Sequence, residues 1–190
     1  MKKNSKLLTK LTPTDYGMKK TMGRGLLMED VFCKIARGEE KSYTVYSDDK
    51  VMVIMDIFPM SRGQTLVIPK KHFVYFYEMP DDLIYSFYKT VNMIGKAMMK
   101  AFNPKAIALI ARGLRVPHYH LILIPVREGD INDKYFSVMD AYQGFPKVSL
   151  DVLQNRIEDF KSFALKGRLQ VNEEDLINDM NKIKESLSNL

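Results

Sequence analysis

The stretch Arg115-Val-Pro-His-Tyr-His-Leu-Ile-Leu-Ile-Pro-Val126 decides the fold prediction, because it places two of the chain's three histidines inside an apolar run. In an extended strand, alternate side chains point to the same face. His118 and His120 therefore share one face, and Ile122 is next in the row. A single histidine in such a strand is more often a buried core residue. A pair on one face, in a chain with so few histidines, indicates a functional site.

The segments on both sides of this stretch predict a mixed fold of strands and helices. The clearest helix begins at Pro80, carries acids in its first turn, and repeats apolar residues every three or four positions. Gly113 provides a tight turn, which makes the histidine strand an antiparallel neighbour of the strand before it. The predicted elements, in chain order, are a helix at 30–36, strands at 43–46, 51–57 and 64–68, a helix at 80–102, strands at 106–111 and 114–126, and helices at 149–166 and from 172 onward.

Length and charge predict one main domain with two appendages. The chain has 190 residues, which suits a single core. We divide it into a basic flexible arm at 1–27, a core domain at 28–127 and a helical carboxyl extension at 128–190. Lys plus Arg total 29 against 23 for Asp plus Glu, a net charge of +6 that is concentrated in the arm. This excess favours anionic partners, and nucleic-acid association through the arm is one hypothesis.

Cysteine usage and hydropathy predict a cytoplasmic protein without a membrane segment. Cys33 is the only cysteine, which excludes an internal disulfide and favours a reducing compartment. No apolar run approaches the roughly 18 residues that cross a bilayer. The basic amino-terminal segment leaves an organelle transit peptide as the alternative.

Paired histidines support three kinds of site chemistry. A metal site usually needs a further ligand close by, and Cys33 is distant in sequence, so we predict no metal and no other cofactor. A serine or cysteine nucleophile would need a positioned hydroxyl or thiol, and no Gly-x-Ser-x-Gly motif is present. The third chemistry uses histidine itself as the nucleophile toward phosphorus. Elsewhere, Asp56 ends an apolar strand and must be solvated or partnered, whereas His72 is predicted to be an exposed loop residue.

Several segments together resemble the histidine-triad (HIT) superfamily, whose signature is His-x-His-x-His followed by apolar residues. The resemblance covers about residues 30 to 127. It implies an α+β fold with a five-stranded antiparallel sheet and a long packed helix, commonly as a homodimer. The matching segments are Phe32-Cys-Lys-Ile35 with Gly38-Glu39, Val45-Tyr46 with Asp48-Asp49, Asp56-Ile57 before Pro59, Gly63 to His72, and Gly113 to Val126.

The resemblance also implies a function and a site. HIT proteins bind a nucleoside monophosphate moiety and hydrolyse or transfer it through a nucleotidyl-histidine intermediate. His120 matches the nucleophile, and His118 the residue whose backbone carbonyl orients the nucleophile's ring. Asp56 matches the acid that binds the ribose hydroxyls. The base pocket is matched by Phe32, Ile35 and Ile54, and Gln64 stands at the polar helper position that a histidine occupies in the family's Gly-His-Thr segment.

Two departures from the signature divide the functional hypotheses. Ile122 replaces the third histidine, and Gln64 replaces the family's usual histidine. Isoleucine can neither donate to a phosphate oxygen nor protonate a leaving group, contributions worth about 10²- to 10⁴-fold in rate. The leading hypothesis is a purine-nucleotide-binding hydrolase or transferase, acting on phosphoramidates or dinucleoside polyphosphates. The alternative is a non-catalytic nucleotide-binding or scaffold module.

Overall fold

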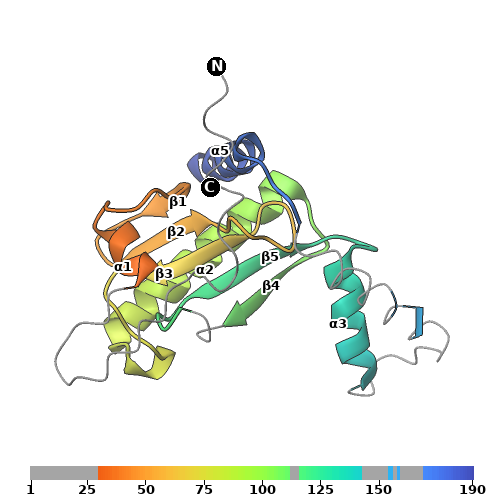
Figure 1. Ribbon diagram of the computed structural model, residues 1–190, viewed down its shortest axis with the longest axis horizontal. Helices are drawn as coiled ribbons and strands as arrows, with labels where there is room; N and C mark the ends of the chain where they lie inside the picture. The colour runs from red at the N-terminus through yellow and green to blue at the C-terminus, as the bar shows by residue number, and fades with distance from the viewer. Residues whose placement is uncertain (1–29, 112–115, 143–153, 156–157, 159–168) are drawn as a thin grey trace.

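The computed structural model describes residues 30–111, 116–142, 154–155, 158 and 169–190, and an antiparallel sheet lies at its centre (Figure 1). The strand order of this five-stranded sheet is β1-β2-β3-β5-β4. The strands are β1 (Thr44–Ser47), β2 (Val51–Met55), β3 (Thr65–Pro69), β4 (Ala106–Ala111) and β5 (Leu121–Val126). The helices are α1 (Val31–Ala36), the short 3-10 helix η1 (Phe76–Glu78), α2 (Asp81–Phe102), α3 (Ile131–Tyr142) and α5 (Glu173–Ser188).

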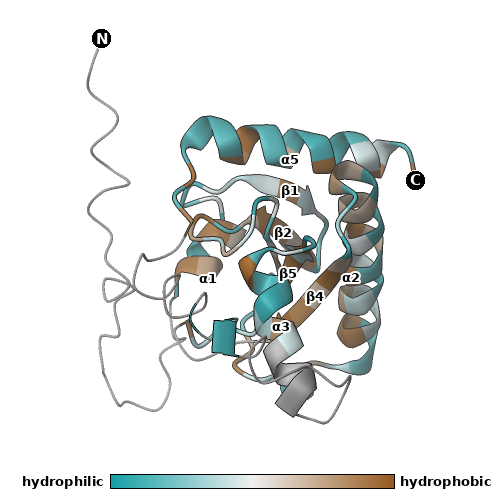
Figure 2. Ribbon diagram, turned by 90° about the vertical axis from the view of Figure 1, so that its right-hand side faces the viewer, coloured by the Kyte–Doolittle hydropathy of each residue, from teal (hydrophilic) through white to brown (hydrophobic). Residues whose placement is uncertain are grey.

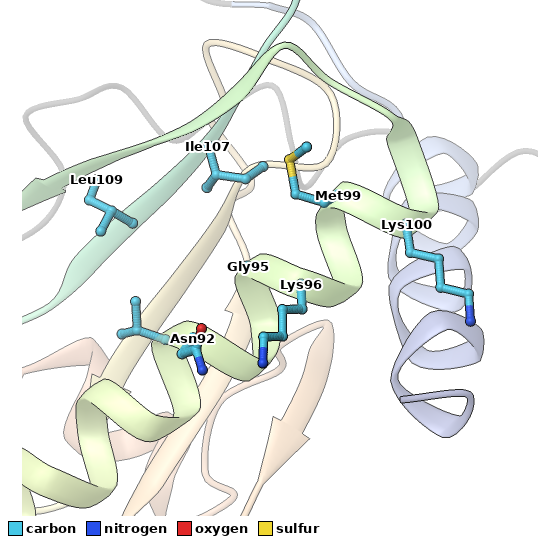
Figure 3. Close-up of a pocket in the computed structure, with 8 residues that line it drawn as sticks. Asn92, Gly95, Lys96, Met99, Lys100, Ile107 and Leu109 are labelled. Carbon is cyan, nitrogen blue, oxygen red and sulfur yellow. The ribbon is translucent and has the colours of Figure 1, made fainter.

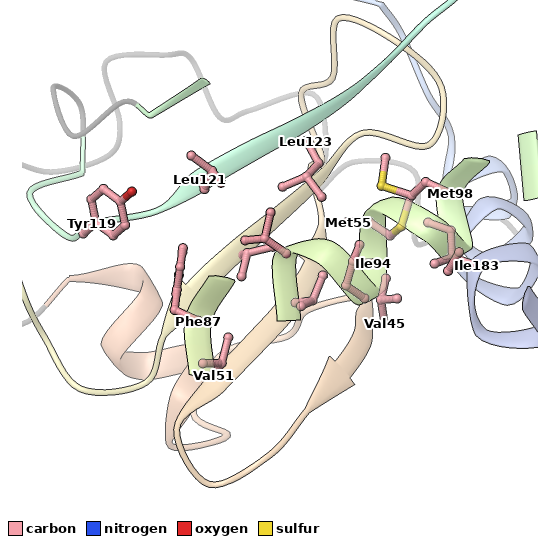
Figure 4. Close-up of a cluster of buried hydrophobic side chains, with 14 of the residues drawn as sticks. Val45, Val51, Met55, Phe87, Ile94, Met98, Tyr119, Leu121, Leu123 and Ile183 are labelled. Atoms are coloured by element: carbon pink, nitrogen blue, oxygen red, sulfur yellow. The ribbon is translucent and has the colours of Figure 1, made fainter. Parts of the chain in front are cut away.

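The central strands are covered on both faces, because every residue of β2, β3 and β5 is buried. The long helix α2 packs on one face and forms the main core with it (Figure 4). Phe87, Ile94 and Met98 of α2 are fully buried there. The short helix α1 covers the opposite face, where Phe32 packs against a second apolar cluster that contains Met52, Ile54, Leu66, Ile68, Ile122 and Ile124.

Helix α5 completes the main core from the end of the sheet that carries β1 (Figure 2). Asn172 and Asp175 form a reciprocal capping box that satisfies amides at its start. Leu176 and Ile183 are buried against the core that α2 builds. Helix α5 of the carboxyl extension is therefore packed into the same core as α2.

The structure confirms the α+β fold with five antiparallel strands and a long packed helix. The positions of α1, α2 and α5 also agree with the sequence-based prediction, and β4 pairs antiparallel with β5 as expected. No helix among the described residues is long and apolar enough to span a membrane. The arm at 1–27, the turn at Arg112–Gly113 and most of the helix predicted at 149–166 lie outside the described residues.

Three elements differ from the prediction, and one of them is the short 3-10 helix η1, which was not predicted. The fifth strand begins at Leu121 instead of Leu114, so His118 and His120 precede it, in a segment that bends at Pro117. Proline cannot donate a ladder hydrogen bond, which is consistent with this late start. Helix α3 was not predicted, because the polar run from Glu128 is typical of a loop. The side chain of Asp130 accepts a hydrogen bond from the Asp133 N–H at 2.8 Å, as at a helix N-cap.

Candidate functional site

His120 is held in one tautomer by the backbone two residues before it. Its Nδ1 lies 2.8 Å from the carbonyl oxygen of His118. A carbonyl can only accept, so Nδ1 carries the hydrogen and Nε2 of the neutral ring keeps its lone pair. Burial, partly offset by the His118 carbonyl, lowers the pKa of His120. The ring is therefore neutral at ordinary pH, with one nitrogen able to act as a nucleophile.

An apolar surface adjoins this ring. Phe32 meets His120 edge-on, with 5.1 Å between ring centroids. Phe32, Ile54 and Ile122 belong to the same buried cluster, and Ile35 packs at its margin. The structure therefore brings together the three residues predicted for the base pocket, and it places Ile122 among them, only 9% exposed.

Asp56 and Gln64 meet where β2 ends and β3 begins. The backbone N–H of Asp56 donates to the carbonyl of Gln64 at 3.0 Å. The Gln64 Nε2 donates to Asp56 Oδ2 at 2.5 Å, and its Oε1 accepts from the Met60 N–H at 3.0 Å. Asp56 Oδ1 accepts from the Phe58 N–H at 2.8 Å. The carboxylate at the strand end, which the sequence predicted must be solvated or partnered, is thus bonded within its own loop.

A second polar cluster lies behind His118 and joins residues far apart in sequence. His118 is fully buried, and its Nε2 donates to the carbonyl of Pro69 at 2.8 Å. Its Nδ1 faces Asp30 Oδ2 at 3.1 Å and Cys33 Sγ at 3.7 Å. His72 Nδ1 lies 2.8 Å from the same Asp30 oxygen and 3.6 Å from Cys33 Sγ.

Asp30 is the centre of this cluster and also begins helix α1. Its side chain caps the helix by accepting from the N–H groups of Phe32 and Cys33, at 2.8 and 3.0 Å. Burial alone would raise the pKa of Asp30, but the contacts with His118 and the Cys33 N–H outweigh it, so the pKa lies well below the usual range. Burial raises the pKa of the Cys33 thiol.

Sequence reasoning missed this cluster, and it wrongly predicted that the loop residue His72 is exposed. His72 is paired with Asp30, and its side chain is only 22% exposed. Cys33 was set aside because it is distant in sequence from the histidine pair, yet α1 brings its sulfur next to His118. The only local signal was Asp30 three residues before Cys33, a spacing that places both at the start of one helix.

The four side chains form a donor set that fits a metal ion. One ligand atom from each of Asp30, Cys33, His72 and His118 lies within 4.8 Å of the other three. Bonds of about 2.0–2.3 Å to tetrahedral zinc place ligand atoms roughly 3.3–3.8 Å apart. The separations of 3.6 and 3.7 Å between Cys33 Sγ and the two imidazole nitrogens agree with this geometry. The carboxylate oxygen would have to move outward by a few tenths of an ångström.

Comparison with known proteins identifies the family. The HIT domain model matches residues 37–129. A HIT-like protein of Methanocaldococcus jannaschii is 40% identical over 104 residues, which cover 53% of this chain and 81% of the relative. The chain belongs to the HIT family. Adenylylsulfatase HINT3 of Arabidopsis thaliana is 35% identical over 105 residues, 53% of each chain.

The fold of this HIT protein is also similar to solved structures. A protein from Sulfolobus tokodaii named as a hypothetical histidine triad nucleotide-binding protein matches with a TM-score of 0.61 and 28% identity, over 84% of this chain and 92% of the other. The hypothesis of HIT membership, drawn from the sequence, is therefore confirmed. The roles of individual site residues remain predictions.

Proposed function

We propose that this HIT protein binds a purine nucleotide and hydrolyses or transfers its nucleotidyl group through His120. The observation that carries the proposal is the hydrogen bond from His120 Nδ1 to the His118 carbonyl, because it leaves the Nε2 lone pair free beside an apolar pocket. Relatives named as a nucleotide-binding protein and as an adenylylsulfatase support the same class of chemistry.

The proposed reaction has two displacements at phosphorus. The Nε2 lone pair of His120 forms a nitrogen–phosphorus bond while the bond from phosphorus to the leaving group breaks, and the leaving group takes that electron pair. The His118 carbonyl stabilises the positive charge that develops on the ring, because it accepts the Nδ1 hydrogen. Water, or an acceptor hydroxyl, then attacks phosphorus, loses its proton to solvent and releases the imidazole.

Ile122 limits which leaving groups the proposed reaction can use. An aliphatic amine must be protonated as it departs, and Ile122 offers no proton. Sulfate or a nucleotide phosphate departs as a stable anion and needs none. We therefore expect adenylyl sulfate to react faster than an adenosine phosphoramidate of an alkylamine.

The decisive experiment compares wild type with His120→Ala on both substrates. We expect single-turnover release of AMP from adenylyl sulfate by wild type, with an adenylylated protein trapped by acid quench, and neither from His120→Ala. Tyr119→Phe is the matched control, because Tyr119 is the adjacent buried ring but belongs to the core on the α2 face. If wild type releases AMP no faster than His120→Ala, the catalytic proposal is wrong.

The alternative function is a nucleotide-binding module without chemistry. It is favoured by Ile122 and by the bonding of both Asp56 carboxylate oxygens within their own loop. Calorimetric binding of AMP by wild type with no turnover of either substrate would establish this alternative. Absence of AMP binding would remove both functions.

We also propose that the protein forms a homodimer through the free edge of β4. In the described part of the chain, β4 pairs only with β5, and Leu109 on β4 is 52% exposed. Figure 3 shows Ile107 beside the exposed Met99 of α2 and Leu109 farther along β4; Val91, Asn92, Gly95, Lys96 and Lys100 complete the pocket. A second copy would extend the sheet and cover these apolar groups. Leu109→Lys should give a monomer by sedimentation analysis, whereas Ile177→Lys, an exposed change on α5, should not.

The cluster behind His118 favours a second role, a structural metal site. Because His118 Nε2 donates to Pro69, its Nδ1 would be a lone pair in the neutral ring, facing the Asp30 carboxylate at 3.1 Å. Two acceptors at this distance repel each other, so either a proton or a metal ion lies between them. We propose that it is a divalent metal ion such as zinc, held by Asp30, Cys33, His72 and His118. The ion would fix α1 to the residue whose carbonyl orients His120.

Metal content tests this role separately from activity. We expect close to one equivalent of zinc in purified wild type by elemental analysis, and loss of the metal in Cys33→Ala. A chelator should lower the unfolding temperature of wild type and leave that of Cys33→Ala unchanged. If wild type contains no metal and does not bind added zinc, the metal proposal fails.

A further inference from the structure

Helix α5 carries a buried acid on the face that packs against the domain. Asp179 is 4% exposed and lies between Leu176 and Ile183, which are 2% and 0% exposed. These three positions share one face of the helix because they are three and four residues apart. A carboxylate in such an apolar row is costly to bury unless it is fully bonded.

In the described part of the chain, the Asp179 carboxylate is bound by the loop between β2 and β3. Its Oδ2 accepts from the backbone N–H of Gly63 at 3.0 Å and from Arg62 Nε at 2.7 Å. Its Oδ1 accepts from Arg62 Nη2 at 3.0 Å. The guanidinium thus binds the carboxylate through two nitrogens, an arrangement that fixes orientation as well as distance. Arg62 also reaches Asp175, one turn earlier on α5, with 2.8 Å between Nη1 and Oδ1.

The same loop carries the residues assigned to the nucleotide. Gly63 has φ of +82°, and the next residue is Gln64, whose side chain binds Asp56. The other side of the loop is held by β5 and the residue that follows it. Ser61 Oγ donates to the carbonyl of Pro125 at 2.8 Å and accepts from Arg127 Nη1 at 2.6 Å. The loop is therefore fixed between the end of β5 and helix α5.

We infer that Asp179 is a positioning residue for nucleotide binding, acting through Gly63 and Gln64 on Asp56. The inference rests on the proposed function, in which Asp56 binds the ribose hydroxyls. Among the described residues, Asp179 forms no hydrogen bond with Asp56 or His120. Its effect is to fix the backbone from which Gln64 holds the ribose-binding carboxylate, so the carboxyl extension becomes part of the site.

The experiment measures AMP binding to full-length Asp179→Asn by calorimetry, at a temperature where circular dichroism shows the variant folded. Asparagine keeps the size of the side chain but removes the charge that binds Arg62. A hydrogen bond to a charged group changes a binding constant by roughly 10- to 100-fold, so we expect the loss of one ribose contact to Asp56 to raise the Kd for AMP by about that factor. Arg62→Lys is a milder second variant, because lysine cannot form the two-nitrogen contact, and its Kd should rise less.

A ribose-specific readout separates positioning from a general loss of stability. Asp179→Asn should weaken AMP much more than 2′,3′-dideoxyadenosine 5′-monophosphate, which lacks the hydroxyls that Asp56 binds. Glu185→Gln is the control, since it neutralises another α5 acid whose side chain is exposed. It should bind both nucleotides as wild type does.

The outcomes distinguish this inference from the proposed function. Failure of wild type to bind AMP would refute the proposed function. If wild type binds AMP and folded Asp179→Asn binds it within twofold of wild type, Asp179 is structural only and the inference is wrong. If Asp179→Asn raises the Kd for AMP and the Kd for the dideoxy nucleotide by the same factor, the effect does not act through Asp56 and the inference is wrong.

Discussion

Replacing Gly63 by alanine should destabilise the protein through two separable effects. Gly63 has φ of +82°, a conformation that costs an L-residue about 1–2 kcal/mol. An added Cβ would also lie 2.5 Å from Cε2 and 2.8 Å from Cζ of Phe102. Ordinary carbon contacts are about 3.5–4.0 Å, so the ring must shift by roughly 1 Å. Overpacking of this kind costs about 1–3 kcal/mol, for a total of about 2–5 kcal/mol.

Urea unfolding followed by circular dichroism measures the change in the free energy of unfolding. Gly38→Ala is the matched control, because Gly38 has φ of +76° and no atom within 4 Å of an added Cβ. Gly38→Ala should lower the free energy of unfolding only by the cost of the backbone conformation, about 1–2 kcal/mol. In a Phe102→Ala background, Gly63→Ala should cost no more than Gly38→Ala does in wild type. An unchanged cost in that background would refute the steric explanation.

Three further predictions concern the site and the arm. Ile122→His should raise the single-turnover rate on an alkylamine phosphoramidate by up to about 10²-fold. It should also lower the urea midpoint of unfolding, because an imidazole replaces a buried apolar side chain. An unchanged rate would show that Ile122 does not limit protonation of the leaving group. Asp30→Ala should cost at least about 1 kcal/mol in urea unfolding from the lost α1 cap, and Asp30→Ser should recover part of it; equal losses would exclude capping as the cause. Deletion of 1–27 should abolish any salt-dependent RNA binding seen by fluorescence anisotropy, and retention of that binding would exclude the arm.

Local patterns in the sequence predicted most of the fold. The apolar runs of β2 and β3 and the three-to-four-residue repeat of α2 are properties of neighbouring residues, and these three elements formed where the patterns placed them, whereas β5 begins seven residues later than predicted. The relation of His120 to His118 is also local, because the carbonyl that fixes the ring belongs to the residue two positions earlier. Helix α3 was missed because its polar first turn is typical of a loop.

The sequence by itself therefore determined the family, the strands and the histidine pair. Only the tertiary structure decided which distant groups meet them. Asp30 and Cys33 reach His72 and His118 because α1 packs near the end of β3. Asp179 reaches Gly63 across 116 positions, because apolar burial seats α5 against the core and turns the acid toward the β2–β3 loop. These contacts have no periodic signature, since they depend on how whole elements pack and not on the residues beside them in the chain.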